Sequence, residues 1–150
     1  MNESLKRLRR GLQLGQAIVW AAVMLPLFLS VVGLAIDGGI VFDNRRELQN
    51  VADSAARAGA TQVDVNAYRA SAGQSVVLDQ ASAQQAATQY LTSQGSGLSG
   101  TVTTDSQHVV VGVNRSVSTS FLRIIGINSI QVLATATAEV QHGITQGTTG

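Results

Sequence analysis

The most apolar segment of the chain is a run of uncharged residues near its start. From Ala17 to Ile36 there are 20 residues without Asp, Glu, Lys or Arg. At about 1.5 Å of rise per residue, a helix of this length covers the roughly 30 Å hydrocarbon core of a bilayer. The pattern predicts a transmembrane helix over residues 17–36, with Pro26 near its middle and Ser30 placed to donate to a carbonyl one turn back.

Beyond Asp37 the pattern becomes amphipathic, with a period of 3.6 residues. This predicts an extracytoplasmic amphipathic helix over residues 37–60, in which Asp53 and Arg57 are spaced for an ion pair. Gly38-Gly39 either forms a hinge before this helix or lies within one long helix. The apolar stripe is built from small residues, which favours close packing against a helix or a sheet. Its members are Val41, Leu48, Val51, Ala52, Ala55, Ala58 and Gly59.

The hydrophobic pattern is weaker in residues 61–78 and in the helix that is expected after them. The pattern of residues 61–78 predicts the end of a helix followed by a loop, with a short strand at 75–78. Asp79 is a suitable N-cap for a helix that runs to about Ser93, and Gly95 is a suitable stop. The run Gly95-Ser96-Gly97 then predicts a linker.

Period-two alternation dominates the rest of the chain. A short strand is predicted at 101–104, followed by a turn at 105–107 and a second strand. In this second strand Arg115 interrupts an alternation of apolar residues, which are Val109, Val111, Val113, Val117 and Phe121. One helical turn ended by Gly126 leads to a last strand over 130–140. Alternation of this kind indicates an antiparallel sheet with one covered face, and the Ala-rich helix is the obvious cover. We therefore expect an α+β fold with a small outer domain over residues 61–142 and a disordered tail over 143–150.

The charge distribution gives the expected orientation. Residues 1–16 hold four basic residues and one acidic residue, a net charge of +3, whereas the remaining six basic and eight acidic residues sum to −2. The positive-inside rule then predicts a cytoplasmic basic leader over 1–16 and an extracytoplasmic C-terminal domain. Basic residues that abut an apolar run, without interleaved aromatic side chains, do not fit a nucleic-acid-binding surface.

Two alternatives to a membrane anchor are a buried helix of a soluble protein and a cleaved signal sequence. A buried helix in a soluble protein would need a large apolar surround, which the remaining sequence does not supply. A signal sequence cleaved after Ala35 or Gly15 would instead release a secreted binding module. Gly33 and Ala35 provide the small residues that signal cleavage needs, but the apolar run exceeds the usual signal core of about 7–15 residues.

Few residues suggest chemistry. The chain has no cysteine, and its only histidines, His108 and His142, lack the spacing of a zinc site. Asp43 and Glu47 stand one helical turn apart, but we interpret them as part of a solvated face that also carries basic residues. We expect no catalytic, metal-binding or cofactor-binding residues, no small-molecule substrate and no enzymatic activity.

The N-terminal features occur together in one known family. Gly15-Gln16-Ala17, Pro26, Asp37-Gly38-Gly39 and the block Leu-Gln-Asn-Val-Ala-Asp-Ser-Ala-Ala-Arg-Ala-Gly-Ala at 48–60 resemble the N-terminal signature of the TadE/TadG-like proteins of bacterial tight-adherence (Tad, or Flp) pilus systems. The Phe-Leu-x-x-Ile-Gly turn at 121–126, before a strand rich in alternating Ala, is similar to that family too. We take the following as candidate packing and assembly positions: Pro26, Asp37, Leu48, Gln49, Asn50, Ala52, Asp53, Ala55, Ala56 and Gly59.

The resemblance implies a single-pass, pilin-like protein of the bacterial inner membrane. Its partners would be the lipid bilayer and other Tad/Flp pilus-machine subunits. One departure from pilin-type precursors matters, because these carry a Glu at the fifth mature position. Cleavage after Gly15 would put Trp20 there, and cleavage after Gly11 would put Gln16 there. The resemblance therefore favours an unprocessed accessory subunit over a fibre subunit.

Overall fold

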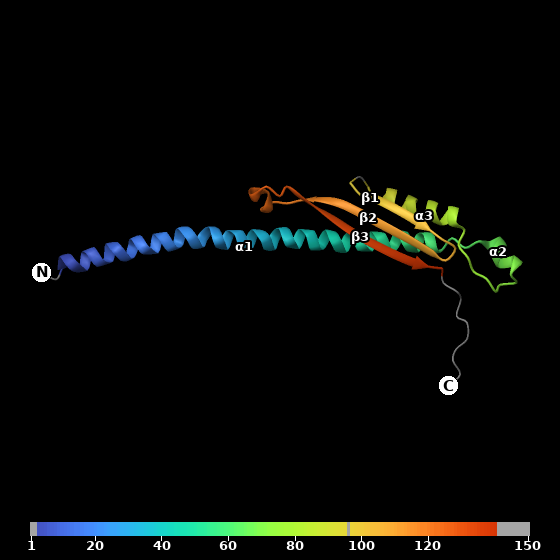
Figure 1. Ribbon diagram of the computed structural model, residues 1–150, viewed down its shortest axis with the longest axis horizontal. Helices are drawn as coiled ribbons and strands as arrows, with labels where there is room; N and C mark the ends of the chain where they lie inside the picture. Colours follow the sequence, from blue (N-terminus) through green and yellow to red (C-terminus); the bar gives the residue numbers. More distant parts are fainter. Residues whose placement is uncertain (1–2, 96, 141–150) are drawn as a thin grey trace, which may run out of the picture. The chain divides into compact units, whose positions relative to one another are not determined.

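A computed structural model describes residues 3–95 and 97–140, with side chains described from residue 16 onward. The tail expected at 143–150 lies outside these residues, as do His142 and Ser96 of the predicted linker. The α+β class is confirmed (Figure 1). The elements are α1 (Glu3–Ala60), α2 (Val65–Ala70), α3 (Gln80–Ser93), β1 (Ser99–Thr104), β2 (His108–Ser118), the 3₁₀ turn η1 (Leu122–Ile125) and β3 (Ser129–Glu139).

The chain divides into two compact units. The first comprises residues 1–40 and 119–128, and the second comprises residues 41–118 and 129–150. The single helix α1 therefore contributes to both units, and the connection between β2 and β3 belongs to the first.

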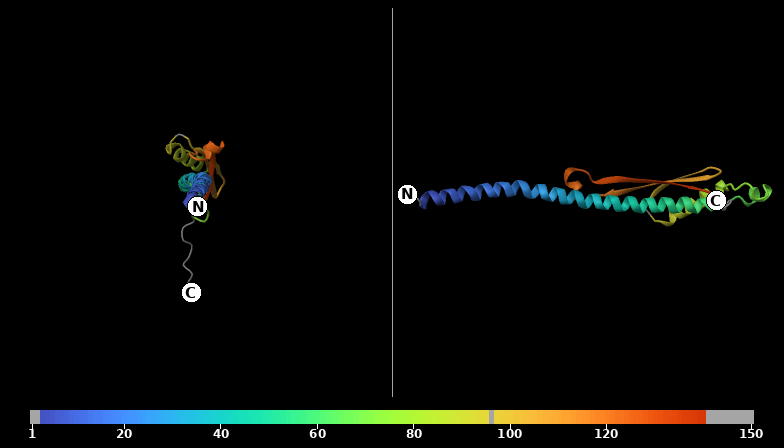
Figure 2. Two further views of the ribbon diagram at one scale, coloured as in Figure 1. Left: turned by 90° about the vertical axis from the view of Figure 1, so that its left-hand side faces the viewer. Right: turned by 90° about the horizontal axis from the view of Figure 1, so that it is seen from below.

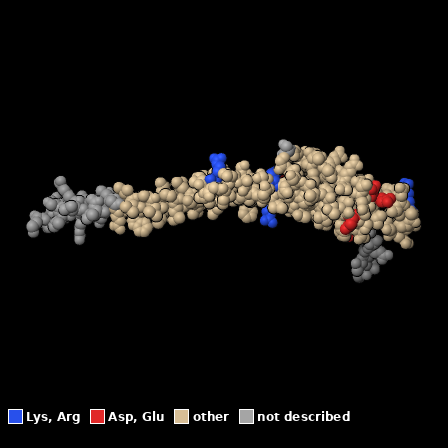
Figure 3. Space-filling view, turned by 45° about the horizontal axis from the view of Figure 1, so that its top comes forward, with Lys and Arg blue, Asp and Glu red and all other residues tan. Residues whose placement is uncertain are grey.

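In the first unit, α1 is long and apolar enough to cross a membrane. Its most apolar window has a mean hydropathy of 2.4, and only 6% of that window is buried. In Figure 3 the part of α1 beside the grey N-terminal residues shows no charged side chain. The Ser30 hydroxyl donates to the Pro26 carbonyl oxygen at 2.8 Å, as predicted. Of the two alternatives for Gly38-Gly39, the structure has both glycines inside one continuous helix.

In the second unit, three antiparallel strands form a sheet in the order β1-β2-β3. Val102 pairs with Val111 across β1 and β2, and Val111 pairs with Ala136 across β2 and β3. The predicted alternation is confirmed, because the inward side chains are buried on both long strands. They are Val109, Val111, Val113 and Val117 of β2 and Val132, Ala134 and Ala136 of β3.

The covered face of the sheet packs against α1 and α3. Leu48, Ala52 and Ala55 of α1 join the core together with the buried residues of α3, which are Ala83, Ala87 and Leu91. Figure 2 (left) shows both helices on the same side of the strands. A Cβ added at Gly59 would lie 2.9 Å from the Ala83 carbonyl oxygen and 3.0 Å from Val109 Cγ1. The small-residue stripe of α1 is therefore what allows two helices and a sheet to meet this closely.

Arg115 interrupts the alternation on the covered side of β2. Its guanidinium donates to the Glu47 carboxylate at 3.0 Å and to Asn44 Oδ1 at 3.5 Å. The charge is thus half-buried at the margin of the core with an acidic partner from α1. Glu47, expected on a solvated face, has this specific role.

Four expectations were wrong in detail. Asp53 does not pair with Arg57 but accepts a hydrogen bond at 3.3 Å from Gln49 Nε2, which also donates to the Thr135 carbonyl of β3. The strand expected at 75–78 is reduced to one bridge between Val63 and Leu78. The short helix α2, capped by Asp64, was not predicted. Finally, β2 ends at Ser118 rather than at residue 121, because the following backbone N–H groups bind α1.

Prediction on helix packing. Ala55→Leu should destabilise the second unit by about 1–3 kcal/mol, because Ala55 is fully buried in a tightly packed stripe. Asn50→Ala, on the exposed face of the same helix, should change stability by less than about 0.5 kcal/mol. Urea unfolding of the full chain in detergent, followed by circular dichroism, measures both. Equal losses for the two variants would contradict the assignment of faces.

Prediction on pH dependence. The Ser82 backbone N–H, at the start of α3, lowers the pKa of Asp79, and the Gln107 and His108 N–H groups lower the pKa of Asp105. Because folding lowers both pKa values, these carboxylates stabilise the fold above their ordinary pKa of 3.8, and this stabilisation is lost as pH falls below it. The urea midpoint should therefore be lower at about pH 3 than at about pH 6.

The combined variant Asp79→Asn and Asp105→Asn is the matched control for this prediction. Asparagine keeps an acceptor oxygen at each turn but does not titrate. The difference between the two midpoints should shrink in this variant. An undiminished difference would assign the pH dependence to other groups.

Candidate functional site

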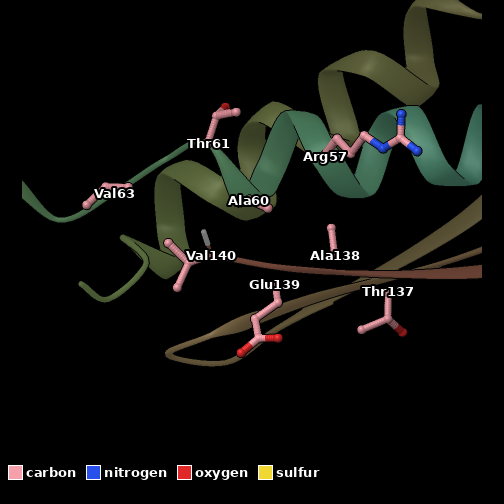
Figure 4. A pocket seen from close by; sticks show the side chains of 8 residues that line it. All are labelled: Arg57, Ala60, Thr61, Val63, Thr137, Ala138, Glu139 and Val140. Atoms are coloured by element: carbon pink, nitrogen blue, oxygen red, sulfur yellow. The ribbon is translucent and has the colours of Figure 1, made fainter. Parts of the chain in front are cut away.

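No enclosed reactive pocket presents itself among the described residues. A groove of about 570 Å³ lies between the end of α1 and β3, but Figure 4 shows the Arg57 guanidinium and the Glu139 carboxylate pointing away from each other. Across all the residues that the structure describes, no three His, Cys, Asp or Glu side chains are grouped to hold a metal ion. His108 Nδ1 lies 3.2 Å from the Asp105 carboxylate at the β1–β2 turn, where both side chains are partly exposed.

The most distinctive polar site is the carboxylate of Asp37. This side chain is buried, with only 1% of its surface exposed. It accepts hydrogen bonds from three consecutive backbone N–H groups, those of Ser120 at 2.8 Å, Phe121 at 2.9 Å and Leu122 at 2.7 Å. These donors, that of Leu122 above all, lower the pKa of Asp37, which lies one residue beyond the predicted span 17–36, against the opposing effect of burial. The group is thereby held as a carboxylate.

Gly33 lies one helical turn before Asp37 on the same face of α1. It is buried beneath the aromatic ring of Phe121, and a Cβ added at Gly33 would lie 2.6 Å from Phe121 Cγ. A glycine is therefore required for the ring to approach the helix this closely. Gly33 and Asp37 together provide a flat apolar surface next to a carboxylate, and the two bind adjacent parts of one loop.

The loop itself, residues 119–128, is here named the docked loop. The Thr119 N–H donates to the Asn128 carbonyl at 3.1 Å, and the Thr119 hydroxyl donates to the Ile127 carbonyl. Inside this closure, η1 forms the predicted helical turn and ends at Gly126. The docked loop is therefore closed by its own hydrogen bonds and fixed to α1 by Asp37 and Gly33.

The structure distributes the ten candidate assembly positions over both units. In the first unit, Pro26 is exposed and Asp37 holds the docked loop. In the second unit, Asn50 is exposed, and Gln49 donates to the Thr135 carbonyl of β3 at 3.2 Å. Asp53 is half-buried, and the remaining five lie in the core: Leu48, Ala52, Ala55, Ala56 and Gly59. A role in assembly with other subunits stays a prediction for all ten.

Sequence reasoning missed Gly33 as a site residue and missed every partner of Asp37. The four-residue spacing of Gly33 and Asp37 indicates a shared helix face, which was the one available signal. The partners are 83 to 85 residues away in the chain, and no local pattern connects them.

Prediction on the docked loop. Asp37→Ala should expose the loop, because three backbone N–H groups would lose their acceptor at once. The Arg123 peptide in the loop then becomes a better trypsin substrate, so its rate of cleavage in the detergent-solubilised full chain should rise. Asp43→Ala, an exposed acid of the same helix, is the control and should leave the rate unchanged. Equal rates in the two variants would refute the role of Asp37.

A second substitution tests the contact with the aromatic ring. Gly33→Ala should also accelerate cleavage after Arg123, because the added Cβ displaces Phe121. Gly38→Ala, where an added Cβ meets nothing within 4 Å, should not accelerate it.

Comparison with known proteins adds one match. Residues 15–62 match the family model described as "Putative Flp pilus-assembly TadE/G-like". No curated protein matches the chain. No solved structure matches it. The matched region contains the apolar segment, Gly33, Asp37 and the small-residue stripe, and it stops before α2 and the sheet. It supports a pilus-related role, and the family is one of pilus-assembly components rather than of known enzymes. The family resemblance is therefore confirmed over residues 15–62, where this chain matches the TadE/G-like family of Flp pilus-assembly proteins.

Proposed function

We propose that this protein is a membrane-anchored, pilin-like accessory subunit of a Tad/Flp pilus-assembly system, acting through helix packing and contacts with other subunits. The observation that carries the proposal is that the surface of one helix changes along its length. Within α1, an exposed apolar segment continues directly into a stripe of small residues buried under a sheet. The family match spans both parts and supports the pilus-related role.

The proposed organisation follows this change along α1. Residues 1–16 form the cytoplasmic leader, 17–36 the single span through the inner membrane and 37–60 the extracytoplasmic helix. Residues 61–142 form the outer domain, in which an antiparallel sheet covers one face of the helix. A helix covered by an antiparallel sheet supports the pilin-like assignment.

The acidic residues support an accessory role over a fibre role. From Gln16 to Ile36 the chain carries no Asp or Glu, so no carboxylate is available in the span to pair with a neighbouring N-terminus. The first acid after the span, Asp37, is already bound to three N–H groups of its own chain. Contacts with other subunits would then depend on exposed surface, such as Phe42 of α1, whose side chain is 70% exposed.

Prediction on topology. The absence of native cysteine allows single-cysteine labelling with a membrane-impermeant maleimide. In spheroplasts Gln85→Cys, on the exposed face of α3, should react at once, whereas Ser4→Cys in the leader should react only after permeabilisation. The reverse pattern would contradict the proposed orientation. Reaction of both cysteines without permeabilisation would contradict a single span.

The N-terminus of the mature protein separates the proposal from its alternatives. Intact mass and N-terminal sequencing of the membrane fraction should recover residues 1–16. A new N-terminus at Gln16 or Leu12 would instead indicate pilin-type processing and a fibre subunit. Recovery from the medium of a chain cut after Ala35 would indicate a secreted binding module.

Contacts with other subunits can be tested in cells. A photo-crosslinking amino acid at position 42 should capture another component of the pilus machine. The same amino acid at Asn50, exposed and polar, is the control for capture by proximity alone. Capture of no pilus component at position 42 or at other exposed positions of α1 would count against the proposed role.

A further inference from the structure

The docked loop carries an uncovered apolar tip. Ile124 and Ile125, both in η1, are 82% and 72% exposed, and Ile127 and Phe121 are 43% and 39% exposed. The loop contains no acidic residue, and its one charged residue is Arg123. Exposed loops are normally polar, and clustered aliphatic side chains at a loop tip mark a surface that binds something apolar.

The position of the docked loop on α1 indicates what that surface meets. Phe121 lies over Gly33, which belongs to the apolar segment 17–36 and stands three residues before its end. At 1.5 Å per residue this is about 5 Å along the helix axis. Figures 1 and 2 show the connection between β2 and β3 beside α1. The loop is therefore fixed at the level where the hydrocarbon core around such a segment would end.

The polar backbone of the docked loop is compatible with a surrounding of low polarity. The N–H groups of residues 120–122 bind Asp37, and those of Thr119, Ile124, Gly126 and Ile127 bind carbonyl oxygens within the loop. An unpaired N–H group would oppose transfer towards lipid, because it would lose its hydrogen bonds with water. The apolar side chains can thus enter a lipid interface without leaving these donors unpaired.

We propose that the docked loop is an interfacial lipid-binding element. Ile124, Ile125 and Ile127 insert into the boundary between headgroups and acyl chains, and Arg123 extends to the phosphate of an anionic lipid. The proposal rests on the proposed membrane span at residues 17–36. A lipid surface is favoured over a protein partner because Gly33 and Asp37 hold the apolar tip next to the exposed apolar surface of the same helix.

The test uses one environment-sensitive fluorophore attached to single cysteines of the full chain. The protein is reconstituted in vesicles of phosphatidylethanolamine and phosphatidylglycerol. The probe at Ile125→Cys should show a blue-shifted emission and several-fold stronger quenching by lipids with a nitroxide near the headgroup than by iodide in the water. The matched control is Leu133→Cys, an aliphatic position of β3 that is 65% exposed, where iodide should be the stronger quencher.

A third position separates the failure of this inference from the failure of the proposed anchor. Phe28→Cys lies near the middle of the apolar segment and is 66% exposed on α1. Its probe should be quenched by nitroxides deep in the acyl chains. If the probe at position 28 is quenched by these nitroxides while the probe at position 125 is quenched by iodide, lipid binding by the loop is refuted and the anchor stands. A Phe28 probe in water would refute both.

One further outcome and one control complete the test. An Ile125 probe shielded from iodide and also from nitroxide lipids would be covered by protein, which refutes lipid binding. Repeating the measurement at Ile124→Cys guards against a local disturbance by one label, because both side chains are exposed and their replacement removes no core contact. Agreement of the two positions is the expected result.

Discussion

A single carboxylate settles how the connection between β2 and β3 folds. β2 ends at Ser118, so the next backbone N–H groups have no neighbouring strand to bind. Asp37 accepts three of them with its two oxygens, and Thr119 closes the base of the loop with its backbone and hydroxyl groups. Without this acceptor, three partly buried N–H groups beside Gly33 would be left unpaired. The local conformation of the docked loop therefore depends on one side chain at the end of the apolar segment.

The second constraint is the size of the side chains in the core. Among the residues that the structure describes, the buried apolar ones are seven Ala, seven Val and three Leu, and none is aromatic. Each Ala or Val removes little area from water, so stabilisation depends on many close contacts rather than on a few large side chains. Gly59 shows how close these contacts are, because a single added Cβ would meet both α3 and β2. The core thus needs the small-residue stripe of α1, which lies within the residues that match the family model.

Periodicity predicted the elements whose form is decided locally. The stripe of α1, the alternation along β3, the Asp79 cap of α3 and the Ser30 bond each follow from residues within one or two turns. The end of β2 could not be predicted in this way, because apolar alternation continues to Phe121 while its N–H is taken by Asp37. Arg115 likewise interrupts its local pattern because its partner, the carboxylate of Glu47, lies far away in the sequence. For the candidate site, the family resemblance pointed to Asp37 and to the turn at 121–126, whereas the role of Gly33 and the contact between Asp37 and the loop were not predicted.

The positions and hydrogen-bond partners of the acidic residues connect the structure to the proposed role. In pilin-type subunits a carboxylate near the start of the apolar helix is available to a neighbouring chain during assembly. Here residues 16–36 carry no Asp or Glu, and Asp37, directly after them, is buried and bound to N–H groups of its own chain. A carboxylate bound to three N–H groups has little capacity left for a second partner, and releasing it would leave those donors unpaired. Asp37 is therefore used within the chain to fold the docked loop, which supports the proposal of an accessory role.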